Sequence, residues 1–137
     1  PRDELAHEVA LSAPAVQRRI RRLREAGVIT HDVSLVDPTA VGMPMTFIVL
    51  VELERERAEQ VDAFRGKAAA EDRIPQCYYV TGEADFVLVA VAASMDDFEA
   101  LTRRLFFDDP NVRRFRTSVA MGSALRSLAV PAGGESA

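Results

Sequence analysis

The chain has 137 residues and a net charge of −4, and 48% of its residues are hydrophobic against 28% that are charged. This composition is typical of one or two folded domains and excludes a chain that is disordered throughout. The N-terminus is polar, no apolar run has the length of a membrane span, and the single cysteine, Cys77, excludes an internal disulfide. We therefore expect a cytoplasmic protein with no membrane partner.

Residues 2–10 predict a short helix, because Leu5 and Val9 form an apolar pair at i and i+4. The chain begins with Pro1 rather than methionine, and the helical pattern follows at once. We therefore expect that the start of the natural protein is missing and that a further helix precedes this one.

Residues 13–26 predict a second helix that is rich in arginine. Ser12 is a suitable N-cap and Pro14 falls in the first turn, where a missing N–H does least harm. Gly27 ends the helix, because glycine readily adopts the left-handed conformation found there. One stripe of this helix is apolar, formed by Val16, Ile20 and Leu23.

The arginine-rich helix carries five arginines against one acid, a local charge of +4, so the rest of the chain carries about −8. A basic segment on an acidic protein is typical of a local nucleic-acid footprint, although a solvated helix face would also explain the charge run. Two helices joined by the short turn at Leu11 and Ser12 have the geometry that places the second in a DNA major groove. The residues expected to contact double-stranded DNA are those at the helix start and away from the apolar stripe: Ser12, Ala13, Pro14, Gln17, Arg18, Arg21 and Arg22. Arg19 lies nearer the stripe, and we expect it to pack and pair with an acid.

Turn residues then separate two domains. Residues 28–36 predict an extended segment, and Asp37-Pro38, Gly42 and Pro44 interrupt the pattern. We expect a DNA-binding domain over 1–36, a linker over 37–44, a second domain over 45–130 and a disordered tail over 131–137.

The second domain predicts alternating strands and helices: strands over 45–53, 76–81, 86–92 and 112–121, and helices over 57–70 and after Ser94. The last strand should place Arg114, Arg116 and Ser118 on one face and Phe115, Thr117, Val119 and Met121 on the other. Leu125, Leu128 and Val130 could add a further strand. The order βαββαβ is the ferredoxin-like α+β pattern, with both helices on one face of an antiparallel sheet. We expect the other face to bind a second copy of the chain.

The turn at Gly82-Glu83-Ala84-Asp85 is a candidate ligand site. A glycine turn leaves backbone N–H groups facing outward for a carboxylate, and Glu83 and Asp85 could meet an ammonium group. An amino acid carries both groups. The same four residues are equally consistent with an ordinary hairpin turn.

Catalytic and metal-binding signatures are absent from the sequence. His7 and His31 are far apart, and Cys77 has no histidine at a metal-ligand spacing. No nucleophile–base pair and no phosphate-binding glycine loop is present. We expect a protein that is not an enzyme and holds no metal or cofactor.

These motifs together resemble the Lrp/AsnC (feast/famine) transcription regulators. The helix-turn-helix signature runs from Leu11-Ser12 through Val16, Arg19, Ile20, Arg22 and Leu23 to Gly27-Val28-Ile29, and residues 79–86 resemble the turn between two strands of the family's ligand-binding (RAM) domain. The resemblance implies a winged-helix-like DNA-binding module, a ferredoxin-like RAM domain and a homodimer or a higher oligomer such as an octamer. It implies that amino-acid effectors bind where RAM domains meet, near the turn and the end of the last strand, at Thr81, Gly82, Glu83, Ala84, Asp85, Thr117 and Ser118. The chain departs from the family in lacking its first helix and in having Glu83 where aspartate is common.

The favoured hypothesis is a sequence-specific transcription regulator that senses an amino acid. Two alternatives stay open: an architectural DNA-binding protein without an effector, and an amino-acid-binding regulatory module of a metabolic enzyme. The basic helix at this distance from the βαββαβ domain speaks against the module.

Overall fold

The structure is a computed structural model, which describes residues 12–122 and 127–133. The chain divides into two compact units, residues 1–35 with 127–137 and residues 36–126. The predicted helix over 2–10 lies outside the described residues.

The first unit contains helix α2 (Ala13–Glu25), which confirms the predicted arginine-rich helix. Residues 31–37 and 127–133 form no strand. The further strand expected near Leu128 and Val130 is therefore wrong for these two residues, and Leu125 lies outside the described part of the chain.

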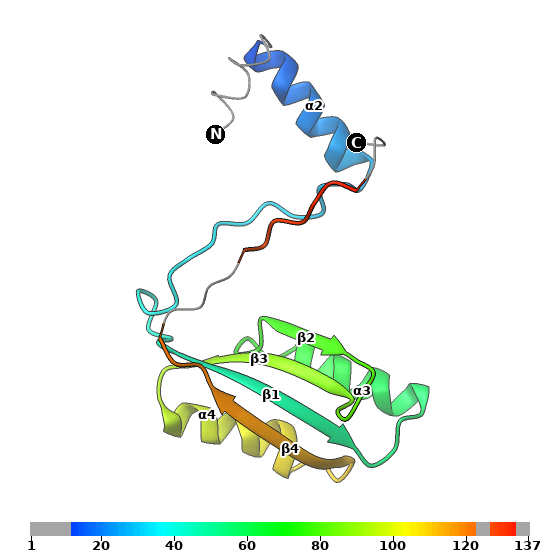
Figure 1. Cartoon of the computed structure of the whole chain (residues 1–137), viewed down its shortest axis with the longest axis vertical. Helices are drawn as coiled ribbons and strands as arrows, with labels where there is room; N and C mark the ends of the chain where they lie inside the picture. The colour runs from blue at the N-terminus through cyan, green and yellow to red at the C-terminus, as the bar shows by residue number, and fades with distance from the viewer. Residues whose placement is uncertain (1–11, 123–126, 134–137) are drawn as a thin grey trace. The chain divides into compact units, whose positions relative to one another are not determined.

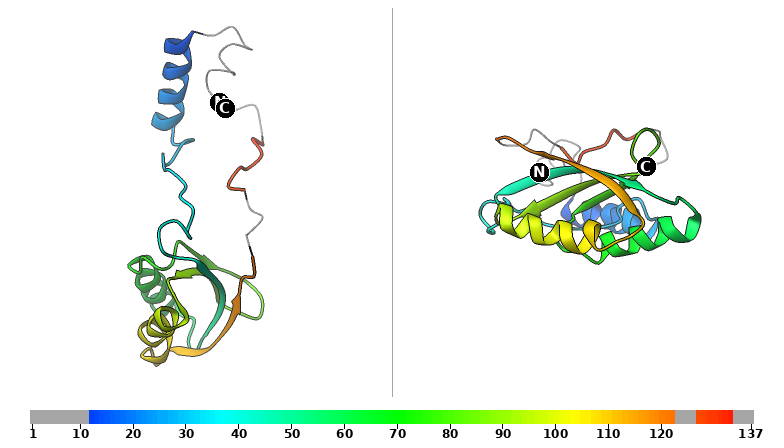
Figure 2. Two further views of the ribbon diagram at one scale, coloured as in Figure 1. Left: turned by 90° about the vertical axis from the view of Figure 1, so that its left-hand side faces the viewer. Right: turned by 90° about the horizontal axis from the view of Figure 1, so that it is seen from below.

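The second unit is one antiparallel sheet with helices on one side (Figures 1 and 2). Its strands are β1 (Met45–Leu53), β2 (Gln76–Tyr79), β3 (Phe86–Ala92) and β4 (Val112–Val119), in the order β2-β3-β1-β4. Its helices are α3 (Ala58–Ala69) and α4 (Met95–Thr102), and α4 continues as a π-helical turn, η1 (Arg103–Phe107). The predicted βαββαβ fold is confirmed.

Two strands end earlier than the sequence predicts. The strand expected to reach residue 81 ends at Tyr79, because the Val80 N–H donates to the Asp85 carbonyl at 2.9 Å and closes the hairpin. The strand expected to reach Met121 ends at Val119, which pairs with Phe47, and the last bond between the two strands runs from the Ala120 N–H to the Thr46 carbonyl at 2.8 Å.

The core lies between the sheet and its helices. Alternate residues of β1 and β3 are buried on that side, as the two-residue period of a strand requires. Helices α3 and α4 cover them with buried side chains, among them Phe64, Phe98 and Leu101. The Phe47 and Phe98 rings stack with centroids 3.8 Å apart. This packing fixes which face of each strand points away from the helices.

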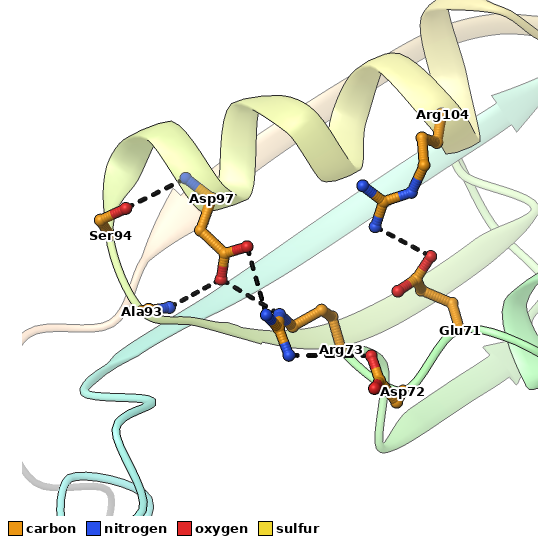
Figure 3. Close-up of polar contacts among 7 residues, drawn as sticks. All are labelled: Glu71, Asp72, Arg73, Ala93, Ser94, Asp97 and Arg104. Carbon is orange, nitrogen blue, oxygen red and sulfur yellow. Dashed lines mark hydrogen bonds and ion pairs between the residues drawn. The ribbon is translucent and has the colours of Figure 1, made fainter.

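Ion pairs join the loop between α3 and β2 to α4 and η1 at the rim of the core. The Arg73 guanidinium, just before β2, contacts the Asp97 carboxylate of α4 at 3.1 Å, and Arg104 contacts Glu71 at 3.1 Å (Figure 3). Asp97 also accepts from the Ala93 N–H, while its own N–H donates to Ser94. The Ala93 hydrogen bond and Arg73 lower the pKa of Asp97 below its ordinary value. The bond from the Asp97 N–H makes Ser94 the N-cap of α4, at the position after which the sequence predicts a helix.

Neither α3 nor α4 covers the opposite face of the sheet (Figure 2). The strand register brings Ile48 opposite Val89 and Leu50 opposite Val87 on this face. These four side chains are partly exposed in the single chain. Arg114 and Arg116 of β4 lie beside them at the sheet edge, opposite Glu52 and Leu50. We call this surface the open sheet face.

Candidate functional site

Local sequence sets both ends of α2. The Ser12 hydroxyl accepts a hydrogen bond from the Ala15 N–H at 3.2 Å, which satisfies one free donor of the first turn. At the other end Gly27 has a φ of +78°, and the Val28 N–H returns to the Leu23 carbonyl at 2.8 Å. This is the closing bond of a Schellman motif. Local hydrogen bonds therefore fix both the first and the last turn of α2.

The two faces of α2 differ as the sequence predicts. Val16 is buried, and Ile20 and Leu23 are partly buried. Every residue expected to contact DNA is exposed: Ser12, Ala13, Pro14, Gln17, Arg18, Arg21 and Arg22. Their exposure leaves their donors accessible, and contact with DNA stays a prediction.

The arginines of α2 divide differently from the sequence expectation. Arg24, which received no role, pairs with Asp32 through its Nε at 2.7 Å, and this ion pair raises the arginine pKa. Arg19, expected to pack and pair, is exposed and meets no acid among residues 12–122 and 127–133. Arg24 lies in the last turn of the helix, close in sequence to the segment that carries Asp32, whereas Arg19 lies more than a turn earlier. Four arginines of α2 thus keep their guanidinium groups free of the described acids.

The second candidate site is the turn between β2 and β3. Gly82 has a φ of +124°, a conformation in which a residue with a side chain is strained. Thr81, Gly82 and Glu83 are exposed, whereas Ala84 is buried. In the described part of the chain, no backbone oxygen accepts from the N–H groups of residues 81–84. The turn therefore presents free donors, as expected for an anion-binding loop.

Asp85 is held inside the fold. It is 9% exposed, and its Oδ2 accepts a hydrogen bond of 2.6 Å from the Leu53 N–H at the end of β1. A side-chain hydrogen bond to Asp85 raises the pKa of Glu56, while a bond to Tyr79 lowers it. Sequence reasoning named Asp85 but missed Glu56, because only the sheet topology brings the loop after β1 to this turn.

Charged side chains connect the turn to β4. The Glu83 carboxylate, 88% exposed, lies 3.6 Å from the Arg116 guanidinium, which also lies 4.0 Å from Glu52. Glu52 in turn holds Arg114 at 3.0 Å. The strand register places Ser118 on the same face as Arg116 and turns Thr117 to the opposite one, as the sequence predicts. Arg116 was placed on its strand face by the sequence but was not recognised as a neighbour of the turn.

The described residues provide few other sites. No three histidine, cysteine, aspartate or glutamate side chains in this part of the chain gather closely enough for a metal ion. Cys77 is partly buried, and burial raises the pKa of its thiol. None of the described helices combines the length and apolar content that crossing a membrane requires.

Comparison with known proteins matches both halves of the chain. Residues 46–130 match the Lrp/AsnC ligand binding domain, and residues 1–30 match a winged helix-turn-helix DNA-binding domain. An HTH-type transcriptional regulator of Sinorhizobium fredii is 47% identical over 129 residues, which cover 94% of this chain and 76% of that protein.

Solved structures extend this likeness to the fold. An AsnC family transcriptional regulator from Agrobacterium tumefaciens aligns with a TM-score of 0.84 at 24% identity, covering 96% of this chain and 85% of that one. The feast or famine regulatory protein from M. tuberculosis, complexed with L-methionine, aligns with a TM-score of 0.78 at 29% identity, covering 93% and 84%. The chain therefore belongs to the Lrp/AsnC family and is a DNA-binding transcription regulator of that type.

Proposed function

We propose that this protein is a sequence-specific transcription regulator that acts as a homodimer and responds to an amino acid. The observation that carries the proposal is the pairing of two uncovered surfaces in one chain: the arginine face of α2 and the apolar open sheet face. A groove-reading helix needs a second copy at a fixed spacing, and a self-complementary sheet face provides a twofold interface.

DNA binding by α2 is supported by charge and by accessibility. Arg18 and Arg21 can donate to phosphates or to guanine edges, and Gln17 offers both a donor and an acceptor. The test is the affinity for a fragment of a regulated promoter against random DNA of equal length at one salt concentration. We expect tighter binding to the promoter by about a thousandfold. Equal affinities would instead support an architectural DNA-binding protein.

Amino-acid binding at the Gly82 turn is supported by the free N–H groups of residues 81–84 and by the nearby charges of Glu83 and Arg116. A structural relative was solved with L-methionine. We propose that Thr81, Gly82, Glu83 and Ala84, with Ser118 on the open sheet face of β4, line the effector site. Thr117, which the sequence also suggested, faces the other side of the sheet and is left out of the proposed site. Asp85 supports this turn from the inside. Calorimetry against the twenty amino acids tests the proposal, and no heat of binding with any of them would refute it.

Effector and DNA would be coupled through the assembly. Strand β4 carries one edge of the open sheet face, and it also lies beside the Gly82 turn through Arg116. An effector bound there would change the contact between copies and hence the spacing of the DNA-reading helices. By linkage, DNA and effector must then change each other's affinity by the same factor. Sedimentation with and without effector measures the assembly, including any octamer.

A further inference from the structure

Arg116 is a cation that the fold places beside the Gly82 turn without binding it tightly. Its guanidinium lies 3.6 Å from Glu83 and 4.0 Å from Glu52, both beyond hydrogen-bond distance. Arg114, two residues earlier on the same strand face, donates to Glu52 at 3.0 Å and 3.4 Å. No residue of the described chain accepts a hydrogen bond from Arg116. Its donors are therefore available to an anion.

Two independent features converge on the same small space. Arg116 supplies planar guanidinium donors, which match a carboxylate in a bidentate way. The Gly82 turn supplies backbone N–H groups that no described backbone oxygen accepts. Within the described residues, the Glu83 side chain connects the two features, because it starts in the turn and its carboxylate lies 3.6 Å from the Arg116 guanidinium. The carboxylate now beside Arg116 is therefore that of Glu83, a residue of the chain itself.

We infer that Arg116 binds the carboxylate of the effector. When no effector is bound, the Glu83 carboxylate of the same chain takes its place beside Arg116. This inference rests on the proposed amino-acid sensing. The α-carboxylate of the amino acid replaces the Glu83 carboxylate at Arg116. The released Glu83 leaves the turn free to rearrange. Because Arg116 lies on the open sheet face, the exchange changes the charge at the rim of the surface proposed to bind a second copy.

The arrangement favours exchange over a permanent ion pair. Glu83 is 88% exposed and Arg116 is 53% exposed, so water screens their attraction and the pair contributes little stability. Glu52, at 17% exposure and held by Arg114, is too firmly bound to leave. Glu83 is therefore the carboxylate that a ligand can displace.

Calorimetry of the full chain with the twenty amino acids measures how each variant changes the affinity for the effector. Arg116→Gln should weaken binding of the recognised amino acid by about tenfold or more, because a charged bidentate contact is lost. Arg113→Gln is the control, because Arg113 is an exposed arginine of the same strand that pairs with no acid of the described residues, and it should change the affinity less than threefold. Glu83→Gln should tighten binding by about two- to fivefold, since it removes the competing carboxylate of an exposed ion pair. The amino alcohol of the same side chain, which lacks the carboxylate, should not distinguish wild type from Arg116→Gln.

A second measurement keeps the inference separate from amino-acid sensing. Acetate is titrated while NMR records the Arg116 side-chain Nε–H and the Gly82 amide. Shifts that saturate, and saturate earlier in Glu83→Gln, support the carboxylate site even if no amino acid binds. If an amino acid binds wild type and Arg116→Gln equally well, the sensing function stands and the role of Arg116 is refuted. If acetate moves neither signal and no amino acid binds, both are refuted.

Discussion

The buried carboxylate of Asp85, in the turn between β2 and β3, accepts a hydrogen bond of 2.6 Å from the backbone N–H of Leu53, the last residue of β1. The Asp85 N–H in turn donates to the Val51 carbonyl at 2.9 Å. One residue of the candidate effector turn is thereby tied by both its backbone and its side chain to the central strand. The exposed part of the turn, with Gly82 and Glu83, stands on this fixed base.

Removing the Asp85 carboxylate should destabilise the fold. In Asp85→Ala the Leu53 N–H stays buried without its acceptor, so we expect the free energy of unfolding to fall by about 2 kcal/mol. Asp85→Asn keeps an oxygen that can accept and should lose less. Urea unfolding measures both, with the exposed Asp62→Ala as a control that stays within about 0.5 kcal/mol of wild type. Equal stability of Asp85→Ala and wild type would contradict a structural role.

The ion pair between Asp97 and Arg73 should make stability depend on pH. The Ala93 N–H and Arg73 lower the pKa of Asp97 in the fold, so its ionised form is favoured there. Its contribution is complete above the ordinary aspartate pKa and is lost as pH falls through the lowered value. We expect Asp97→Asn to unfold at lower urea than wild type at pH 7, and the gap to close below about pH 4. Asp96→Asn, in the same first turn of α4, is the matched control and should show no such gap.

Two glycines should respond to alanine with opposite signs. Gly82 has a φ of +124°, so Gly82→Ala should lower the free energy of unfolding by about 1 kcal/mol or more through backbone strain. Gly66 lies within α3, and an added Cβ would meet nothing within 4 Å. Gly66→Ala should therefore raise stability by about 0.5–1 kcal/mol. Thermal or urea unfolding of both variants checks the pair, and the same sign for both would show that the turn conformation is wrong.

The open sheet face should determine the assembly. Val89 lies in the middle of this face, opposite Ile48. A lysine there would bury an unpaired charge in a sheet-to-sheet contact. Val89→Lys should therefore sediment at a lower mass than wild type while keeping its circular dichroism spectrum. Met95→Lys, on exposed α4, should sediment like wild type. Unchanged sedimentation of Val89→Lys would place the interface elsewhere.

The arginines of α2 should differ in their effect on DNA binding. Arg18→Ala removes a free guanidinium, so the salt dependence of binding should become shallower by about one unit of log K per log salt. Arg24 is engaged by Asp32, so Arg24→Ala should change the slope less. Filter binding over a range of salt concentrations measures both slopes. Equal slopes for Arg18→Ala and wild type would remove Arg18 from the phosphate contacts.

Local patterns in the sequence predicted most elements of the second unit. Strand β1 has the predicted bounds because every second residue from Phe47 to Leu53 is apolar and packs on the helices. Ser12 and Ser94 marked helix starts because a cap depends on residues only three positions apart. Strand ends were less well predicted. β4 ends where its pairing with β1 ends, at Val119 opposite Phe47, and these two residues lie far apart in the chain.

At the candidate effector turn, some features follow from local sequence and others only from the tertiary structure. The chain by itself determined the glycine turn, the capped arginine helix and the face of β4 that carries Arg116, because each depends on periodicity or on near neighbours. Only the tertiary structure decided that Asp85 binds Leu53, that Glu56 joins it, and that Glu83 meets Arg116. These contacts join segments that are far apart in sequence. Their partners follow from strand order and register, which the whole hydrophobic core selects and no local pattern encodes.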